Sequence, residues 1–252
     1  MPHADTPGPR IGYQERTYRR LVRSHLHAEQ VVVQQTDLGI YSSVPLAAEA
    51  RAAVLAQRGY LERYIQRFPD FQQTLRPWPA DPLAPPLVRE MIDAAQRAAV
   101  GPMAAVAGAL AEAVGRRLRR WSPEIIVENG GDIYFEIQRP LTVAVFAGAS
   151  PLSLQIGVRI QPDRGLRAIC SSSGSVGHSL SLGRADAVCI LSDNCALADA
   201  VATATGNRVG SAADIQSAVD WARHIQGVRG VLVVVGRAMG AWGDLETLPL
   251  RQ

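Results

Sequence analysis

The chain has 252 residues, of which 47% are hydrophobic and 19% charged, and its formal net charge is +3. This composition is typical of a soluble globular protein, and the length suffices for one large domain or two fused smaller ones. All 26 basic residues are arginine, which excludes a Schiff-base lysine, a P-loop lysine and a lysine general base.

The N-terminal half is predicted to hold two strands followed by helices. We expect residues 1–10 to form a disordered tail. Loose apolar alternation from residues 11–36 into EQVVVQQTDLGIYSS indicates two strands. Apolar positions at helical spacing predict a helix from Pro45 to Pro69 and a second helical region from about Leu87 to Arg120. The second region should break at VGPM, because proline cannot sit inside an unkinked helix.

After Pro123, strands predominate. The stretch EIIVENGGDIYFEI predicts two strands joined by a tight turn at Gly130 and Gly131. Further strands are predicted in LTVAVFAG, LQIGVRI, LRAICSS and ADAVCILS. Two helices follow, in CALADAVATATGN and AADIQSAVDWARHIQ, and the first should end at Gly206 and Asn207. A buried strand and a hairpin in GVLVVVGRAMGAWG end the chain.

The order of these elements is alike in the two halves of the chain: two strands, two helices, then two or more strands. A duplicated ββααββ unit is the economical interpretation, and it predicts an α+β fold with helices on one face of largely antiparallel sheets. We expect residues 11–140 to form the first half and residues 141–252 the second. Together they would make one compact domain with a ligand pocket between the halves.

The motif ENGGDI has two interpretations. Asn-Gly is the usual sequence of a hairpin turn that requires positive φ. Two adjacent glycines also let the backbone approach a ligand closely, and the residues around such a ligand would be Asn129, Gly130, Gly131 and Asp132. The sequence alone favours neither interpretation.

The motif LADAVATATG places Asp199 and Thr203 one helical turn apart on the same face. A carboxylate and a hydroxyl, helped by a backbone carbonyl, make a hard-oxygen site suited to Mg²⁺. Interaction of the aspartate with the helix dipole, and of the threonine with a backbone carbonyl, also explains the pair. Taken alone, the pair favours this second interpretation.

The run CSSSGSVGHS is either a polar loop between strands or a ligand-binding loop. In the second case the hydroxyls and amides of Ser172, Ser173 and Gly174 would wrap an anion, and His178 would donate to it or transfer a proton. A serine hydrolase is disfavoured, because the chain contains no G-x-S-x-G motif.

The stretch VGPMAAVAGALAEAVG is rich in alanine and glycine, including Gly101 and Gly108. Small residues of this kind are typical of closely packed helices. A helix that begins just after Gly101 and Pro102 could also receive a phosphate at its N-terminus.

Taken in this order, the four motifs resemble those of the ApbE-like proteins, and most closely their uncharacterised bacterial and archaeal branch. The resemblance spans roughly residues 15–240 and also includes TDL at Thr36–Leu38. The better-known relatives are FAD:protein FMN transferases, which cleave FAD with Mg²⁺ and attach FMN to a serine or threonine of a target protein. The resemblance therefore implies a T-fold-like architecture, a flavin nucleotide as ligand and Mg²⁺ as cofactor.

The resemblance also implies roles for particular residues. Asp199, Thr203 and the carbonyl of Ala202 would hold the metal, with Asp199 and His178 as catalytic residues, and the turn at Gly130–Asp132 would lie beside the flavin nucleotide. Gly108 and Glu112 stand where the transferases have the glycine and the aspartate of a Lys-Gly…Asp motif, and the resemblance implies that they too help to bind the flavin nucleotide.

Two departures from the transferase pattern are serious. Ala107 replaces the lysine of the Lys-Gly pair, and the residues after His178 lack the Asp, Pro and Thr of the H-x-x-D-P-x-T-G motif. The fold and a ligand pocket can survive such losses, whereas the transferase chemistry need not.

These observations leave two main functional hypotheses. The first is a Mg²⁺-dependent flavin-nucleotide transferase or FAD pyrophosphate-cleaving enzyme, with a protein target in the former case. The second is a non-catalytic or repurposed ligand-binding protein in sulfur or cofactor metabolism. A structural partner within a homo-oligomer is a third and weaker alternative.

We expect a cytoplasmic protein that binds neither nucleic acid nor membranes. The N-terminal sequence has no apolar leader, no run of about 18 apolar residues occurs, and the three cysteines lack CxxC spacing. The basic residues are scattered, and no aromatic residues are interleaved with the densest group, Arg116 to Arg120.

Overall fold

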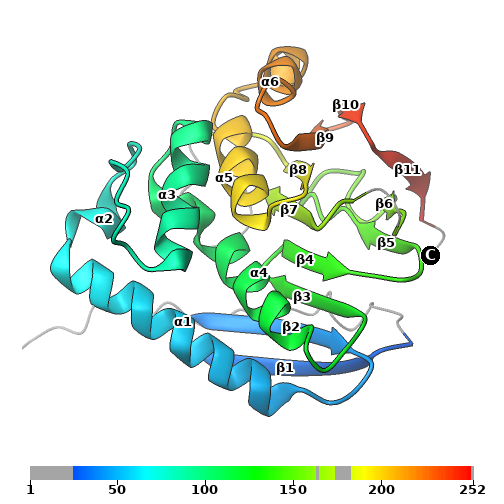
Figure 1. Ribbon diagram of the computed structural model, residues 1–252. Coiled ribbons are helices and arrows are strands. Elements are labelled where there is room, and N and C mark those ends of the chain that lie inside the picture. The colour runs from blue at the N-terminus through cyan, green and yellow to red at the C-terminus, as the bar shows by residue number, and fades with distance from the viewer. Residues whose placement is uncertain (1–24, 163–164, 174–182, 251–252) are drawn as a thin grey trace, which may run out of the picture.

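The computed structural model describes residues 25–162, 165–173 and 183–250 (Figure 1). Its main feature is a sheet of eight antiparallel strands in the order β1-β2-β3-β4-β7-β8-β9-β10. The strands are β1 (His27–Val33), β2 (Thr36–Ser42), β3 (Ile125–Asn129), β4 (Asp132–Glu136), β7 (Ala168–Ser172), β8 (Ala187–Ser192), β9 (Val228–Val235) and β10 (Ala238–Gly243). The expected N-terminal tail, residues 1–10, lies outside the described residues.

The helices lie between the second and third strands of each set of four. Between β2 and β3 are α1 (Ala47–Arg67), α2 (Asp70–Gln73), α3 (Pro86–Ala98), a 3₁₀ turn (Pro102–Ala105) and α4 (Val106–Leu118). Between β8 and β9 are α5 (Cys195–Gly206), a 3₁₀ turn (Ala212–Asp214) and α6 (Ile215–Ala222). The order of strands, helices and strands therefore occurs twice, and the predicted α+β fold with antiparallel sheets is confirmed. The first unit has one short helix more than expected, α2, whereas the separation of α3 from α4 at Pro102 agrees with the predicted break.

A second, smaller sheet covers the face of the large sheet opposite the helices (Figure 1). It contains β5 (Leu141–Ala144), β6 (Ile156–Ile160) and β11 (Glu246–Pro249), in the order β11-β6-β5. The sequence predicts β5 and β6 as strands, but it predicts neither their separation from the large sheet nor β11. In β11 only Leu248 is even half-buried, so its sequence carries almost no alternating pattern.

The central strands of the large sheet are buried on both faces. In β3, Ile125 and Val127 pack against the helices, whereas Ile126 belongs to the core shared with the small sheet. In β9, likewise, Val231 and Val233 pack against the helices, whereas Leu232 belongs to the core shared with the small sheet. Burial on both faces explains why these strands are continuous apolar runs in the sequence.

The break between α3 and α4 lies where the proline predicts it. Gly101 precedes Pro102 and lies so close to another segment that a Cβ atom there would be 1.9 Å from the carbonyl oxygen of Thr74. No single helix in the described part of the chain is long and apolar enough to cross a membrane; α3 and the segment Pro102–Leu118 meet the criterion only jointly, and they are bent by 107°.

One glycine in α1 is unfavourable for the helix. Gly59 lies in the interior of α1, and a Cβ atom there would meet only the end of the flexible Arg63 side chain, at 3.5 Å. We expect Gly59→Ala to raise the free energy of unfolding by about 0.5–1 kcal/mol, because alanine has the higher helix propensity. Urea denaturation measures this change, and a decrease would show that the site is more crowded than the structure indicates.

Candidate functional site

The predicted site residues converge where the N-terminal end of α4 crosses α5. The helices are in such close contact that a Cβ atom on Gly108 would lie 2.3 Å from the carbonyl oxygen of Cys195 and 2.9 Å from Cβ of Asp199. Only glycine fits this crossing without moving backbone atoms. The alanine-rich stretch is therefore, at Gly108, a close helix contact.

Asp199 of α5 accepts hydrogen bonds from the first turn of α4. Its Oδ2 lies 2.9 Å from the amide nitrogen of Gly108, and the amide of Ala107 also donates to the carboxyl group. These amides have no partner within their own helix, so Asp199 caps α4 from a neighbouring helix. Burial raises the pKa of Asp199 to about 7, against the opposing effect of the two amides.

The ENGGDI motif forms the predicted turn between β3 and β4. Gly130 and Gly131 have φ values of 74° and 112°, which fit glycine far better than any other residue. Oε1 of Glu128 accepts hydrogen bonds from both glycine amides, at 2.6 and 3.3 Å. Glu128 is not among the residues predicted from the sequence, although its place directly before Asn-Gly was an available signal.

The same turn contacts α4 and β7. The side-chain amide of Asn129 donates to the carbonyl oxygen of Ala107 at 3.1 Å. The carbonyl oxygen of Gly131 accepts from the amide and the hydroxyl of Ser171, at 3.2 and 3.0 Å. Asp132 is buried, and it lies opposite Cys170 in the strand register of β4 and β7. The turn, the start of α4, Asp199 and the end of β7 thus form one cluster.

The serine-rich motif is described only in part. Ser172 is the last residue of β7, and Ser172 and Ser173 are half-buried. Gly174 and His178 lie outside the described residues, so their predicted roles in ligand binding and proton transfer remain predictions.

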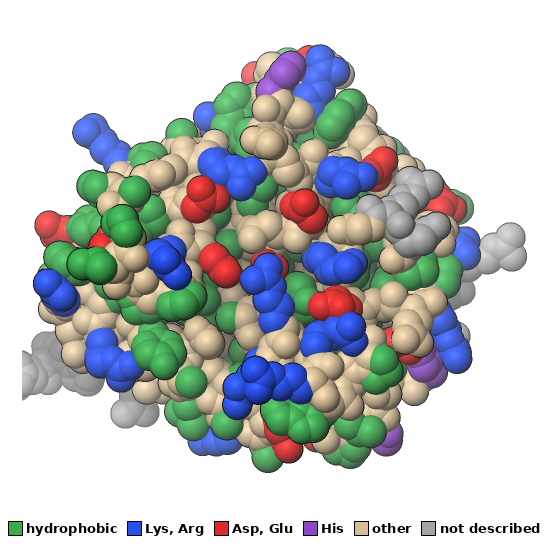
Figure 2. All heavy atoms as spheres, viewed as in Figure 1, with side chains coloured by type: hydrophobic (Ala, Val, Ile, Leu, Met, Phe, Trp, Pro, Cys, Tyr) green, Lys and Arg blue, Asp and Glu red, His purple; other side chains and the backbone are tan. Residues whose placement is uncertain are grey.

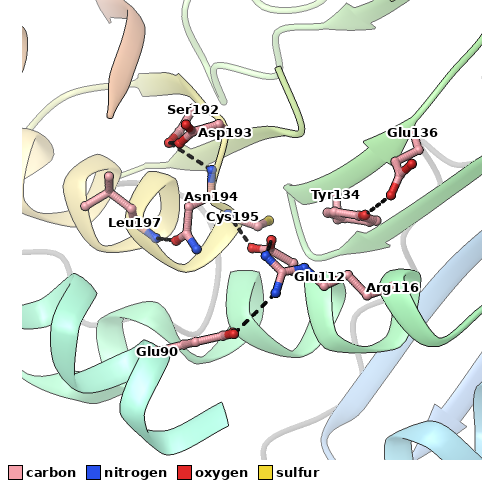
Figure 3. Close-up of polar contacts among 10 residues, drawn as sticks. All are labelled: Glu90, Glu112, Arg116, Tyr134, Glu136, Ser192, Asp193, Asn194, Cys195 and Leu197. Carbon is pink, nitrogen blue, oxygen red and sulfur yellow. Dashed lines mark hydrogen bonds and ion pairs between the residues drawn. The ribbon is translucent and has the colours of Figure 1, made fainter. Parts of the chain in front are cut away.

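Glu112 lies one turn further along α4, at the N-terminus of α5 (Figure 3). Its Oε2 accepts a hydrogen bond from the amide of Cys195 at 2.7 Å, and its Oε1 accepts one from Arg116 at 2.5 Å. Only 1% of Glu112 is exposed, and burial raises the pKa of its carboxyl group. Asn194 caps the same helix by accepting from the amide of Leu197 at 2.7 Å. The two helices therefore cap each other, Glu112 acting on α5 and Asp199 on α4.

The predicted metal ligands all lie on α5. Asp199 is buried and Thr203, one turn later, is half-buried, whereas Ala202 between them is fully buried. A carboxylate and a hydroxyl on one helical face fit the hard-oxygen preference of Mg²⁺. Among the described residues, no three His, Cys, Asp or Glu side chains gather as a metal-binding group, so a bound cation would need further oxygen ligands from backbone, water or ligand.

Two thiols lie beneath this cluster. The Sγ atoms of Cys170 and Cys195 are 3.5 Å apart, and both residues are free and fully buried. Burial raises the pKa of the Cys195 thiol to about 11, which keeps it protonated at neutral pH.

The positive φ of the turn predicts a stability effect. We expect Gly131→Ala to lower the free energy of unfolding by about 1–2 kcal/mol, because alanine at φ near 112° is strained. Gly210→Ala is the matched control, since Gly210 is exposed and a Cβ atom there would lie 3.4 Å from its nearest neighbour, Oδ2 of Asp214. Thermal denaturation of the two variants tests this, and equal melting temperatures would contradict it.

A family model described as AbpE bacteria matches residues 19–242. The chain belongs to this family. It is also 38% identical over 220 residues to a UPF0280 protein of Methanosarcina acetivorans, a match that covers 86% of this chain and 87% of that relative. The resemblance to the uncharacterised ApbE-like branch is thereby confirmed.

Solved structures support the same fold. The apo flavinyl transferase ApbE of Pseudomonas stutzeri is similar with a TM-score of 0.56 and 14% identity, covering 86% of this chain and 94% of that one. The H257G mutant of the flavin transferase ApbE of Vibrio cholerae gives a TM-score of 0.55 and 11% identity, covering 87% and 97%. At such low identity these similarities show the fold alone, and the expected ApbE-like architecture is confirmed.

Proposed function

We propose that this protein binds a flavin nucleotide at the cluster around Asp199, with its phosphates beside the β3–β4 turn. The observation that carries the proposal is the convergence of three separate motifs: Asn129 contacts the start of α4, Gly108 contacts Asp199, and Gly131 contacts β7. The ApbE-like fold and the names of the flavin transferases that share it support the choice of ligand.

Mg²⁺ would be held by Asp199 and Thr203, with the carbonyl of Ala202 as the further ligand that the resemblance implies. Bound there, it would neutralise phosphate charge and polarise the FAD pyrophosphate. The chain's own residues would then act as follows: Asn129 to Asp132 position the ligand beside the turn, Gly108 keeps α4 against α5, and Ser172 and Ser173 contribute hydroxyls. His178 would assist proton transfer.

We propose the reaction as Mg²⁺-dependent transfer of FMN from FAD to a protein, or cleavage of the FAD pyrophosphate. The test is titration of the purified protein with FAD, with and without Mg²⁺, followed by flavin fluorescence and calorimetry and by assay of released AMP. Asp199→Asn should weaken Mg²⁺-dependent FAD binding by about tenfold or more, because a carboxylate ligand is lost.

Asp214→Asn is the matched control for this experiment. Its carboxylate also accepts backbone amides, from Ser211 and Gly210, but it lies at the surface before α6. Tight FAD binding that is independent of Mg²⁺ and of Asp199 would contradict the metal assignment. Failure of the wild-type protein to bind FAD at all would contradict the proposed ligand.

A repurposed, non-catalytic binding protein is the second candidate. Its support is that the chain's own carboxylates already occupy the amides that would otherwise face an anion: Asp199 binds those of α4 and Glu128 binds those of the glycine turn. Ala107, in place of the transferase lysine, points the same way. FAD binding without AMP release or FMN transfer would favour this candidate.

A further inference from the structure

The C-terminal half of α1 and the loop before α3 form a hollow of about 350 Å³. Its walls include Tyr60, Arg63, Arg67, Phe68, Asp81 and Leu83, and we call it the α1 groove. None of the residues assigned above to the candidate site lines it. On the left of Figure 2, over α2 and the end of α1, hydrophobic side chains gather among basic ones, with a few acidic side chains beside them.

The arginines of the α1 groove have no acidic partner among the described residues. Two other arginines of these helices do form ion pairs: a guanidinium nitrogen of Arg58 lies 2.7 Å from Oε1 of Glu62, and one of Arg97 lies 3.3 Å from Oδ2 of Asp93. Arg63 and Arg67 form no such ion pair with any described residue. Each instead lies over an aromatic ring, Tyr60 and Phe68 respectively, at 5.2 Å from the ring centre.

The single carboxylate in the wall is already engaged. Asp81 accepts a hydrogen bond from the hydroxyl of Tyr64 at 2.9 Å and one from the amide of Leu83 at 3.0 Å. Two guanidinium groups and one bound carboxylate leave the groove with net positive charge. A ligand that brings carboxylates therefore complements it.

The groove also exposes large apolar side chains on a firm base. Leu83 is 95% exposed, and Tyr60 is 45% exposed. Beneath them Tyr64 packs edge-on against Phe71, and Phe71 against Trp78, with ring centres 5.0 and 5.5 Å apart. Tyrosine and arginine are the residue types enriched at the energetically important positions of protein–protein interfaces.

We propose that the α1 groove docks an acidic segment of a partner protein, whose carboxylates bind Arg63 and Arg67 while an apolar side chain of the segment covers Tyr60 and Leu83. The exposed Leu83 favours a polypeptide over a small phosphate ligand, because a phosphate would leave this side chain in water. This inference does not depend on flavin binding at the Asp199 site.

The test is binding of a fluorescein-labelled peptide made of Glu, Leu and Gly, measured by fluorescence anisotropy, beside a peptide in which every Glu is replaced by Lys. The wild-type protein should bind only the acidic peptide, and salt should weaken the complex. Charge reversal of both arginines, Arg63→Glu with Arg67→Glu, should weaken binding by about tenfold or more. Leu83→Ala should weaken it by about threefold.

Arg237→Glu is the matched control, because Arg237 is exposed in the turn between β9 and β10, away from α1 (Figure 1). It should bind the acidic peptide like the wild type, and circular dichroism should show that every variant is folded. Failure of the wild type to bind, or equal binding by the double charge-reversal variant, would overturn the proposal. Displacement of the peptide by AMP would also overturn the proposal, because it would assign the groove to a nucleotide. So would a dimer that Leu83→Ala dissociates, because the groove would then bind a second copy of the chain.

Discussion

Gly108→Ala is expected to lower the free energy of unfolding by about 3 kcal/mol, at the upper end of the usual range for overpacked sites. The added Cβ atom would lie 2.3 Å from the carbonyl oxygen and 2.8 Å from the carbonyl carbon of Cys195. Both are backbone atoms of α5, so the strain cannot be relieved by rotating a side chain, and the helices must separate. The change is measured by urea denaturation.

Gly59→Ala serves as the control for this substitution, because it makes the same change in a helix where the added Cβ atom meets only the end of the flexible Arg63 side chain, at 3.5 Å. It should stabilise the protein, whereas Gly108→Ala should destabilise it. Separation of the helices should also weaken the contact between Asp199 and α4, so Gly108→Ala should impair any ligand binding that Asp199→Asn impairs. Equal stability of the two alanine variants would contradict the close crossing.

Asp199→Asn is expected to stabilise the metal-free protein at pH 8 and to leave it nearly unchanged at pH 4. The folded protein raises the pKa of Asp199 from 3.8 to about 7, chiefly by burial. Between these pH values the folded chain holds a proton that the unfolded chain has released. The free energy of unfolding should therefore fall as the pH rises from about 4 to about 7, by at most about 4 kcal/mol, and then stay level.

Asparagine has the same shape as aspartate and carries no charge, and its side-chain oxygen can still accept the hydrogen bond from the amide of Gly108. The variant should therefore lack this pH dependence. Urea denaturation at pH 4, 6 and 8 measures this pH dependence.

Asp214→Asn, the control variant, should behave in the opposite sense. Its pKa is lowered by hydrogen bonds from the amides of Ser211 and Gly210, so its carboxylate stabilises the fold at neutral pH and loses that effect as the pH falls through the folded pKa. The same pH profile for the wild type and Asp199→Asn would contradict the burial of this charge.

The expected stability cost of the Asp199 charge at neutral pH supports the functional role proposed for this residue. A buried carboxyl group that costs stability at neutral pH lies at the crossing of two helices, where an asparagine would fit. Such a cost is typical of sites where a charge serves binding or chemistry. Glu112, which also has a raised pKa, is closed in by Arg116 and α5, and its contacts are those of a helix-capping group.

Local motifs allowed much of the fold to be predicted from the sequence. The turn at Gly130 and Gly131 follows from Asn-Gly, because the φ requirement of such a turn concerns only the residues within it. The break at Pro102 and the end of α5 at Gly206 are local in the same way. The repeated order of strands and helices follows from apolar periodicity, which each segment carries within itself.

The partners of the site residues could not be predicted in this way. Asp199 and Thr203 are recognisable as a pair on one helical face, but the amides that bind Asp199 belong to residues 107 and 108, in a distant helix. Glu128 is the exception, because it binds the turn that directly follows it and its place before Asn-Gly was a signal within the sequence. β11, and the separation of β5 and β6 from the large sheet, also went unpredicted; in β11 only Leu248 is even half-buried.

The α+β class, the duplicated order of elements, the glycine turn and the ApbE-like membership could all be predicted from the sequence, since each rests on patterns within short segments or on motifs in order. Three features follow only from the packed fold: Gly108 is a contact between helices, Asp199 and Glu112 each cap the other's helix, and Arg63 and Arg67 face outward without acidic partners among the described residues. The physical reason is that capping, desolvation and ion pairing depend on distances between atoms far apart in the chain, and those distances exist only once the helices have packed on the sheet.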